Sequence, residues 1–342
     1  MYIYKRKRQK VEKTMVFKKM HFINPHIQGV KRNLLNVFLW KLGYYNDKYT
    51  PLPAPEDFHY PLPASFFDAN QPSVTWINHC TFLIQFEGVG LLTDPIWADR
   101  CSPIPFLGPK RQHAPALSLA ELPMIHFVLI SHNHYDHLDK KTVLALDRLN
   151  PEITWIVPQG LKKWFKKLRI KNIVELAWWK EAHLSISKNS SLSFKITSVP
   201  SQHFSGRNGF DLNATLWTGW VGEFYRKKGA LKRFYFAGDT GYNSHDFKKI
   251  GEKWKEMDIS FIPIGTYVPR KFMSPVHVEP KDAVQIHQEV YSKLSIGMHW
   301  KTFHLSDEPL HQPPYDLFLE MNNKRLNPQS FLVLEPGHQI NW

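Results

Sequence analysis

The sequence predicts an α/β fold whose buried strands end in side chains that can bind metal. Short apolar runs alternate with a few segments of helical periodicity, and four of these runs are followed by His132, His203, Asp239 or His299. The composition is that of a globular chain, with 43% hydrophobic and 22% charged residues among 342. Because α/β folds collect functional groups at strand ends, we expect the four strand ends to meet in one site.

Regular elements are expected from residue 73 onward. The apolar runs that predict strands lie at 74–77, 82–86, 91–93, 125–130, 153–157, 194–199, 233–236, 259–264 and 295–298. A helix is predicted over 140–149, where Val143 and Leu146 share one face. A second helix is predicted over 280–291, with Pro280 in its first turn.

The chain is expected to divide into an N-terminal extension, residues 1–72, and a main domain, residues 73–342. Residues 1–29 form a basic arm that we expect to be poorly ordered. Residues 44–72 contain six prolines, which excludes a regular helix or a central strand there. Since this stretch also carries apolar anchors such as Phe58 and Tyr60, we expect it to wrap around the main domain.

The positive charge is concentrated in the extension. Ten of the 44 Lys and Arg residues lie within residues 1–35 beside a single acid, Glu12, so this stretch carries +9 of the net +14. Such an arm favours an anionic partner, which leaves anionic lipid and nucleic acid open. Residues 30–42, VKRNLLNVFLWKL, have the pattern of an amphipathic helix that either packs on the main domain or lies on a membrane surface.

Neither a secretory signal nor a membrane-spanning segment is expected. The start MYIYKRKRQK is charged, no apolar signal region follows it, and no apolar run reaches the roughly 18 residues of a membrane span. We therefore expect a cytoplasmic protein, either free or bound peripherally to a membrane surface. The two cysteines, Cys80 and Cys101, exclude a disulfide framework.

The strongest motif is the sequence His132-Asn-His134-Tyr-Asp136-His137. Four side chains that can ligate metal occur within six residues, directly after a predicted strand. Imidazole and carboxylate together suit zinc and related divalent ions. A loop after a strand can turn His132 and His134 towards one ion and direct Asp136 and His137 towards a second.

This HxHxDH pattern resembles that of the metallo-β-lactamase superfamily. A closer resemblance, to the N-acylphosphatidylethanolamine-hydrolysing phospholipases D and their bacterial relatives, extends over about residues 73–335. It rests on LTDPI, GPKR, SHNHYDHLD, IVPQG, ELAWW, PSQH, FAGDTGY, IPIGTY, PRKFM, HVEP and MHWKTF, in that order. Three differences from the family pattern replace none of the ligand positions: Asn78-His79 instead of Gly-His, Lys271 instead of an aromatic residue, and Val276 instead of Gln.

The resemblance implies a four-layer αββα sandwich that binds two zinc ions, or other divalent ions in their place. One ion would be held by His132, His134 and His203. The other would be held by Asp136, His137 and His299, with Asp239 bridging the two ions. A hydroxide shared by the ions would attack the phosphorus of a phosphodiester, because two bound ions lower the pKa of water towards about 7.

The resemblance also implies roles for residues beside the ligands. Asp136 and His277 are the predicted catalytic residues, and His277 would donate a proton to the leaving oxygen or bind phosphate. Tyr135 and His277 are the predicted substrate-binding residues. Asp94 has two readings: it orients a ligand histidine, or it forms a turn before Pro95.

The implied activity is release of N-acylethanolamine and phosphatidic acid from a phospholipid. Another hydrolase of the same fold, such as a sugar-phosphate lactonase or a nuclease, stays open, as does a lipid-binding protein without catalysis. Nucleic acid is the weaker partner, because the excess charge lies largely in the arm while Trp178, Trp179, Phe272 and Met273 suit an apolar substrate. The partners expected are therefore a phospholipid, an anionic membrane surface and a second copy of the chain in a homodimer.

Overall fold

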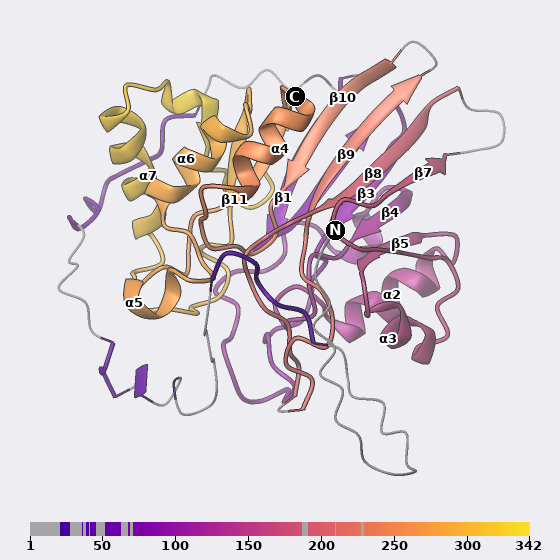
Figure 1. Ribbon diagram of the computed structural model, residues 1–342, viewed down its shortest axis with the longest axis horizontal. Helices are drawn as coiled ribbons and strands as arrows, with labels where there is room; N and C mark the ends of the chain where they lie inside the picture. The colour runs from indigo at the N-terminus through magenta and orange to yellow at the C-terminus, as the bar shows by residue number, and fades with distance from the viewer. Residues whose placement is uncertain are drawn as a thin grey trace, which may run out of the picture.

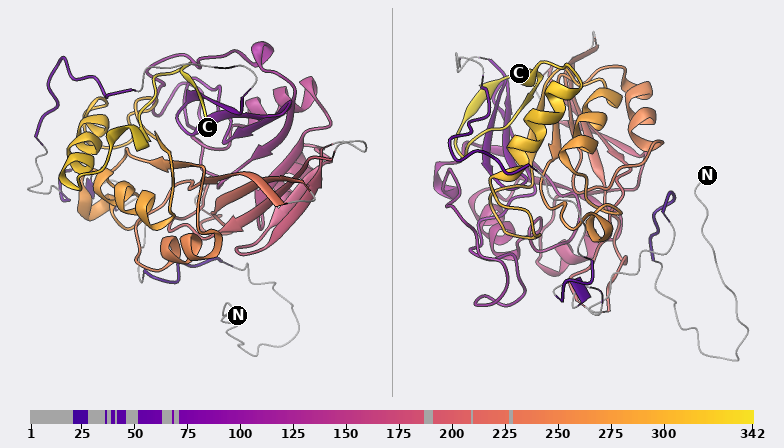
Figure 2. Two further views of the ribbon diagram at one scale, coloured as in Figure 1. Left: turned by 90° about the horizontal axis from the view of Figure 1, so that it is seen from above. Right: turned by 90° about the vertical axis from the view of Figure 1, so that its left-hand side faces the viewer.

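The chain folds into two seven-stranded sheets that pack face to face, with helices on their outer sides (Figure 1). The computed structural model describes residues 21–27, 36, 39–40, 42–45, 52–62, 68, 71–186, 191–208, 210–226 and 229–342. Seen from above, the purple and magenta strands of one sheet lie across from the salmon strands of the other (Figure 2). The α/β sandwich expected from the sequence is thus confirmed.

The first sheet has the strand order β14-β1-β2-β3-β4-β5-β6. Its strands are β1 (Ser73–Asn78), β2 (Thr81–Phe86), β3 (Val89–Thr93), β4 (Ile125–Leu129), β5 (Thr154–Pro158), β6 (Ile173–Leu176) and β14 (Gln339–Asn341). Strands β3 to β6 run parallel to one another. The helices α2 (Lys140–Leu149) and α3 (Lys162–Lys167) connect these strands, and the short 3-10 helix η1 (Leu119–Glu121) precedes β4.

The second sheet has the strand order β13-β12-β11-β10-β9-β8-β7. Its strands are β7 (Glu181–Ser185), β8 (Ser193–Val199), β9 (Gly219–Arg226), β10 (Gly229–Phe236), β11 (Ile259–Pro263), β12 (Ser295–Met298) and β13 (Phe331–Leu332). Strands β10 to β13 are parallel. The connecting helices are α4 (Asp246–Trp254), α5 (Arg270–Met273), α6 (Pro280–Glu289), α7 (Gln312–Asn323) and the 3-10 helix η2 (Pro328–Ser330).

Strand β4 explains why the sequence reads as an unbroken apolar run before the HxHxDH motif. Successive side chains of a strand point to opposite faces. Phe127 and Leu129 belong to the hydrophobic core between the sheets, whereas Val128 and Ile130 pack with the residues beneath α2 and α3. Both faces of β4 are therefore buried, and the strand holds the following motif at a fixed place between the two sheets.

Residues 52–62 lie along the main domain without forming a helix or a strand. The Phe58 ring packs against Tyr315 at 5.0 Å and Phe318 at 5.5 Å between ring centroids. The Tyr60 hydroxyl donates a hydrogen bond to the Phe331 carbonyl oxygen at 2.6 Å. These aromatic anchors tie the proline-rich stretch to α7 and β13.

Residues 21–27 also contact the main domain, whereas the basic sequence predicts a poorly ordered arm over residues 1–29. The Phe22 amide donates to the Asn213 carbonyl oxygen at 2.8 Å, and Asn24 Nδ2 donates to the His203 carbonyl oxygen at 2.6 Å. These two contacts join residues 191 and 179 positions apart along the chain, which the local charge pattern does not reveal. Residues 1–20 and most of the predicted amphipathic helix at 30–42 lie outside the described residues.

No helix among the described residues combines the length and the apolarity needed to cross a bilayer.

A buried carboxylate joins three strands of the second sheet. Glu223 on β9 lies directly opposite Lys195 on β8 and Arg233 on β10. Its oxygens lie 2.6 Å from Lys195 Nζ and 2.9 Å from an Arg233 terminal nitrogen, and Trp254 Nε1 donates to it at 3.2 Å. Burial alone would raise the pKa of Glu223, but the hydrogen bonds from Lys195 and Arg233 outweigh it and lower that pKa.

The substitution Glu223→Gln should lower the free energy of unfolding by about 2 kcal/mol at pH 7, between the values typical of surface and buried ion pairs. Because the folded-state pKa is lowered, the stability contributed by the carboxylate is present above its unfolded pKa of about 4.3 and is lost as pH falls through the folded value. Urea unfolding of both proteins at several pH values measures the difference. Glu87→Gln, which removes a half-exposed partner of Arg226, is the matched control with an effect below about 1 kcal/mol. If the two proteins differed in free energy of unfolding as much at pH 3 as at pH 7, this account would be contradicted.

Candidate metal centre

The predicted ligands converge where strands of both sheets end. His132 follows β4 of the first sheet. His203, Asp239 and His299 follow β8, β10 and β12 of the second sheet. These three strands run in the same direction, so the residues that follow them lie at one edge of that sheet. The site is thus built by loops that leave both sheets and meet between them.

Three imidazoles form the first group of candidate ligands. His134 Nδ1 lies 2.8 Å from His132 Nε2 and 3.2 Å from His203 Nε2. The three ring nitrogens point towards one another and could hold a single ion. This is the set that the family resemblance assigns to the first ion.

The second group is arranged around one oxygen of Asp136. Asp136 Oδ2 lies 3.3 Å from His137 Nε2 and 3.5 Å from His299 Nε2. A fourth side chain, His79, brings its Nε2 to within 3.2 Å of the same oxygen. The predicted set of Asp136, His137 and His299 is brought together, and His79 joins it although the sequence analysis noted it only as part of a motif difference.

Asp239 lies between the two groups. Its Oδ2 atom is 3.1 Å from His299 Nε2 and 3.3 Å from His137 Nε2 in the second group. The same oxygen is 3.7 Å from His203 Nε2 and 3.9 Å from His132 Nε2 in the first group. A carboxylate in this position can be shared by two cations.

Burial and charge give the two groups different protonation behaviour. Burial lowers the pKa of His134 to about 4 and that of His203 to about 3, so both rings are neutral at pH 7 and keep a lone pair for a cation. Burial alone would raise the pKa of Asp136 and Asp239, but the neighbouring histidines, first of all His137, lower both well below the usual range. Burial alone would lower the pKa of His137 and His299, but the carboxylates, first of all Asp239, raise both, that of His299 to about 9. The two buried negative charges are thus balanced by these two rings, or by cations that take the place of their protons.

Four of the candidate ligand histidines form a hydrogen bond through Nδ1, the ring nitrogen that points away from the centre. These bonds fix the tautomer and the orientation of each ring. The pairs are His132 Nδ1 with Ser131 Oγ at 2.8 Å, His137 Nδ1 with Asp94 Oδ2 at 2.7 Å, His203 Nδ1 with the Val276 carbonyl oxygen at 3.0 Å, and His299 Nδ1 with Thr266 Oγ1 at 3.1 Å.

Asp94 orients a ligand histidine, which is one of the two roles that the sequence left open for it. This fully buried carboxylate accepts hydrogen bonds from His137 Nδ1 at 2.7 Å, from the Ser131 hydroxyl at 2.6 Å and from the Ser131 amide at 2.7 Å. Since Ser131 in turn contacts His132, Asp94 supports histidines of both groups.

Tyr135 and His277 flank the cluster in different ways. The Tyr135 hydroxyl donates to the Arg207 carbonyl oxygen at 3.3 Å, and its ring lies 3.8 Å below the Arg207 guanidinium. Tyr135, the predicted substrate-binding residue, thus also positions the positively charged side chain of Arg207, a contact that no sequence motif indicated. His277 Nδ1 lies 4.0 Å from Asp239 Oδ2, and its ring centroid is 5.1 Å from that of His203.

The residues present fit divalent cations. Within the described part of the chain, His137 Nε2, His299 Nε2 and Asp239 Oδ1 are buried without a hydrogen-bond partner, although buried polar atoms are normally paired. These atoms face the shared centre, and imidazole with carboxylate is a donor set that suits zinc and its neighbours. The orphaned atoms are thus those that a bound cation would satisfy.

The fold and the centre define a metal-dependent hydrolase of the β-lactamase superfamily. A family model described as the beta-lactamase superfamily domain matches residues 90–300, a range that includes all seven predicted ligands. The solved structure of Igni18, a metallo hydrolase of Ignicoccus hospitalis, has a TM-score of 0.56 at 19% identity and covers 80% of this chain and 98% of its own. That likeness reflects a common fold.

Curated relatives narrow this class to one family. The N-acyl-phosphatidylethanolamine-hydrolyzing phospholipase D 1 of Caenorhabditis elegans is 41% identical over 270 residues, which are 77% of this chain and 74% of the relative. The mitochondrial enzyme of the same name in Saccharomyces cerevisiae is 32% identical over 240 residues, which are 70% of this chain and 49% of that protein. The chain belongs to the N-acyl-phosphatidylethanolamine-hydrolyzing phospholipase D family, as its motifs predicted.

Proposed function

We propose that the chain hydrolyses the phosphodiester of N-acylphosphatidylethanolamine on the headgroup side, releasing N-acylethanolamine and phosphatidic acid. The observation that carries the proposal is the position of Asp239, whose Oδ2 lies within 3.9 Å of histidine nitrogens from both ligand groups. A pair of adjacent cation sites suits an anionic phosphodiester, because both the attacking and the leaving oxygen need charge stabilisation. The name of the relative at 41% identity supports the choice of substrate.

Two zinc ions are the proposed cofactor, and other divalent ions could take their place. His132, His134 and His203 would hold one ion, Asp136, His137 and His299 the other, and Asp239 would contact both. When bound, two such ions bring the pKa of water towards about 7 and offset the charge of a phosphate.

The chain's own residues would complete the reaction. His277 borders Asp239 on the side of His203, where its imidazole would donate a proton to the leaving oxygen of the amide alcohol. Arg207 is held in place by its hydrogen bonds to the carbonyl oxygens of Asn133 and Leu138 at 2.8 and 2.7 Å and by the Tyr135 ring. Its charge would draw the phosphate towards the centre, with Tyr135 acting on substrate through this guanidinium.

Hydrolysis in oxygen-labelled water should place the label in phosphatidic acid, because attack occurs at phosphorus and the amide alcohol leaves with its own oxygen. Mass spectrometry of both products from N-acylphosphatidylethanolamine measures this.

The substitution His277→Ala should lower kcat about 100-fold, the usual range for loss of a proton donor, while metal content stays unchanged. His304→Ala, at an exposed histidine of the loop after β12, is the matched control.

Label in a released fatty acid would contradict the proposal, since it indicates attack on an ester carbonyl. Efficient opening of a sugar-phosphate lactone without action on phospholipid would assign the chain to another activity of the same superfamily. Full turnover after removal of metal by a chelator would exclude the proposed chemistry.

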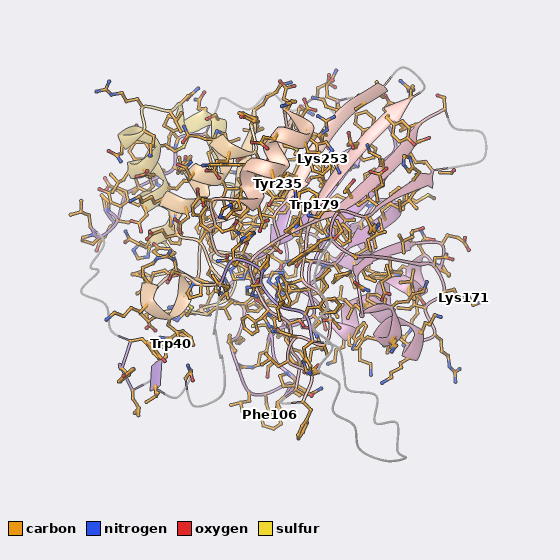
Figure 3. All side chains as sticks on the ribbon, viewed as in Figure 1. Trp40, Phe106, Lys171, Trp179, Tyr235 and Lys253 are labelled. Carbon is orange, nitrogen blue, oxygen red and sulfur yellow. The ribbon has the colours of Figure 1, made fainter. Side chains whose placement is uncertain are left out.

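We further propose that the chain meets its lipid at a membrane surface through an exposed loop, residues 102–109, which we name the apolar loop. Phe106 is 83% exposed and Leu107 59% exposed, and Phe106 projects at the lower edge of the molecule in Figure 3. The loop is held at its base by the Arg100–Lys110 bridge and by a hydrogen bond from Arg100 to the Gly108 carbonyl oxygen. Exposed aromatic and aliphatic side chains beside basic residues suit an anionic lipid surface.

Hydrogen bonds connect the base of the apolar loop to the candidate metal centre. The Gln112 amide donates to the Thr302 carbonyl oxygen at 2.9 Å, and the Thr302 hydroxyl accepts from the His79 amide at 2.7 Å. A membrane bound by this loop would therefore be connected to the second ligand group through Thr302 and His79. The basic arm at residues 1–20, the other expected lipid contact, lies outside the described residues.

The substitution Phe106→Asp should weaken binding to vesicles containing anionic phospholipid about tenfold, because it replaces a ring that would insert into the lipid interface with a charge. Sedimentation with vesicles measures binding, and turnover of a water-soluble phosphodiester should be unaffected. The control is Met124→Asp, at a residue 70% exposed that precedes β4 and so lies at the opposite end of that strand from His132. Equal vesicle binding by Phe106→Asp and the native chain would refute the membrane contact and leave the hydrolysis proposal intact.

A further inference from the structure

His79 occupies a turn whose backbone conformation is unfavourable for most residues. It follows β1 with φ at +42°, in the left-handed region. Its amide donates to Thr302 Oγ1 at 2.7 Å, and its carbonyl oxygen accepts from Trp76 Nε1 at 3.0 Å and from the His299 amide at 3.2 Å. A strained residue persists only where its surroundings fix it, and here three contacts do so.

The His79 ring is directed into the second ligand group. Its centroid lies 4.2 Å from that of His299 and 5.3 Å from Phe303, which meets it edge-on. Its Nε2 lies 3.2 Å from Asp136 Oδ2. By distance alone, His79 could either coordinate an ion together with Asp136 or donate a hydrogen bond to that carboxylate.

The opposite ring nitrogen separates these two roles. A histidine that binds metal almost always donates its other N–H to an acceptor or to water. His132, His137, His203 and His299 have such an acceptor in this structure, and the outer nitrogen of His134 is not among the buried unpaired atoms. His79 Nδ1 is buried and has no hydrogen-bond partner among the described residues. A neutral ring has one N–H, and an N–H left unpaired in the interior is costlier than a lone pair left unpaired. The hydrogen therefore belongs on Nε2, where Asp136 accepts it.

We infer that His79 is a positioning residue that donates a hydrogen bond from Nε2 to Asp136 Oδ2 and thereby fixes this carboxylate for the second ion, without coordinating the ion itself. This inference rests on the proposed function for the presence of two ions. Asp136 is only partly buried, with 14% of its side chain exposed, so an added contact helps to fix its position.

Two substitutions distinguish a donor from a ligand. His79→Gln keeps an N–H near the Nε2 position, whereas His79→Phe keeps the ring packing against Phe303 and His299 without any donor. Metal-free full-length protein is titrated with zinc against a competing chelator, and the affinity of each ion is measured. His79→Phe should weaken the second ion 10- to 100-fold and leave the first unchanged, as found for outer partners of metal ligands. His79→Gln should stay within about threefold of the native protein.

His287→Leu is the matched control, because it removes another buried histidine, which contacts Ser295 away from the centre at 2.8 Å. It should change neither ion. Equal loss of the second ion in His79→Gln and His79→Phe would show that His79 is a ligand and would overturn the inference. Native affinity in His79→Phe would overturn it too. If His79→Phe does not fold, His79→Leu supplies the donor-free variant. A native chain that binds fewer than two ions would refute the proposed function before any variant is compared.

Discussion

Two carboxylates buried among imidazoles are the constraint on which the rest of this structure depends. Asp136 and Asp239 keep their negative charge because histidines surround them, and an uncompensated charge in the interior would cost several kcal/mol. Each carboxylate is supplied by a loop that follows a different sheet, so the charges meet only when the two sheets pack together. The two carboxylates therefore come together only in the folded sandwich, so the ions that it is proposed to hold would stabilise the fold.

The surroundings of the cluster serve to hold these charges in place. Asp94 on the first sheet supports His137 directly and His132 through Ser131, while Thr266 and the Val276 carbonyl do the same for His299 and His203 from loops that follow β11. The groups proposed to act on substrate or lipid, His277, Arg207 and the apolar loop, lie on loops around these side chains, as is common where a scaffold carries functional groups on loops.

The sequence predicted the α/β class and a metal site at strand ends because those signals are local, whereas the sandwich and the division of the ligands into two groups came from the family resemblance. The apolar run before His132 and the polar residues after it occur within a dozen positions, and α2 begins and ends at the residues that its spacing predicts. The sequence did not predict the strands β6, β7, β9, β13 and β14 or the helices α3, α4, α5 and α7. His79 carried one signal, a histidine directly after a strand, but its neighbour Asp136 is 57 residues away. The contact of Asn24 with His203 spans 179 residues and had no signal at all.

Anomalous X-ray diffraction at the zinc edge, from crystals of the full chain grown with zinc, tests the central claim most directly. The account predicts two peaks in the interior between the sheets. One should lie among the ring nitrogens of His132, His134 and His203, and the other among Asp136, His137 and His299, with Asp239 between them. A single peak, or peaks only at surface histidines, would contradict the account.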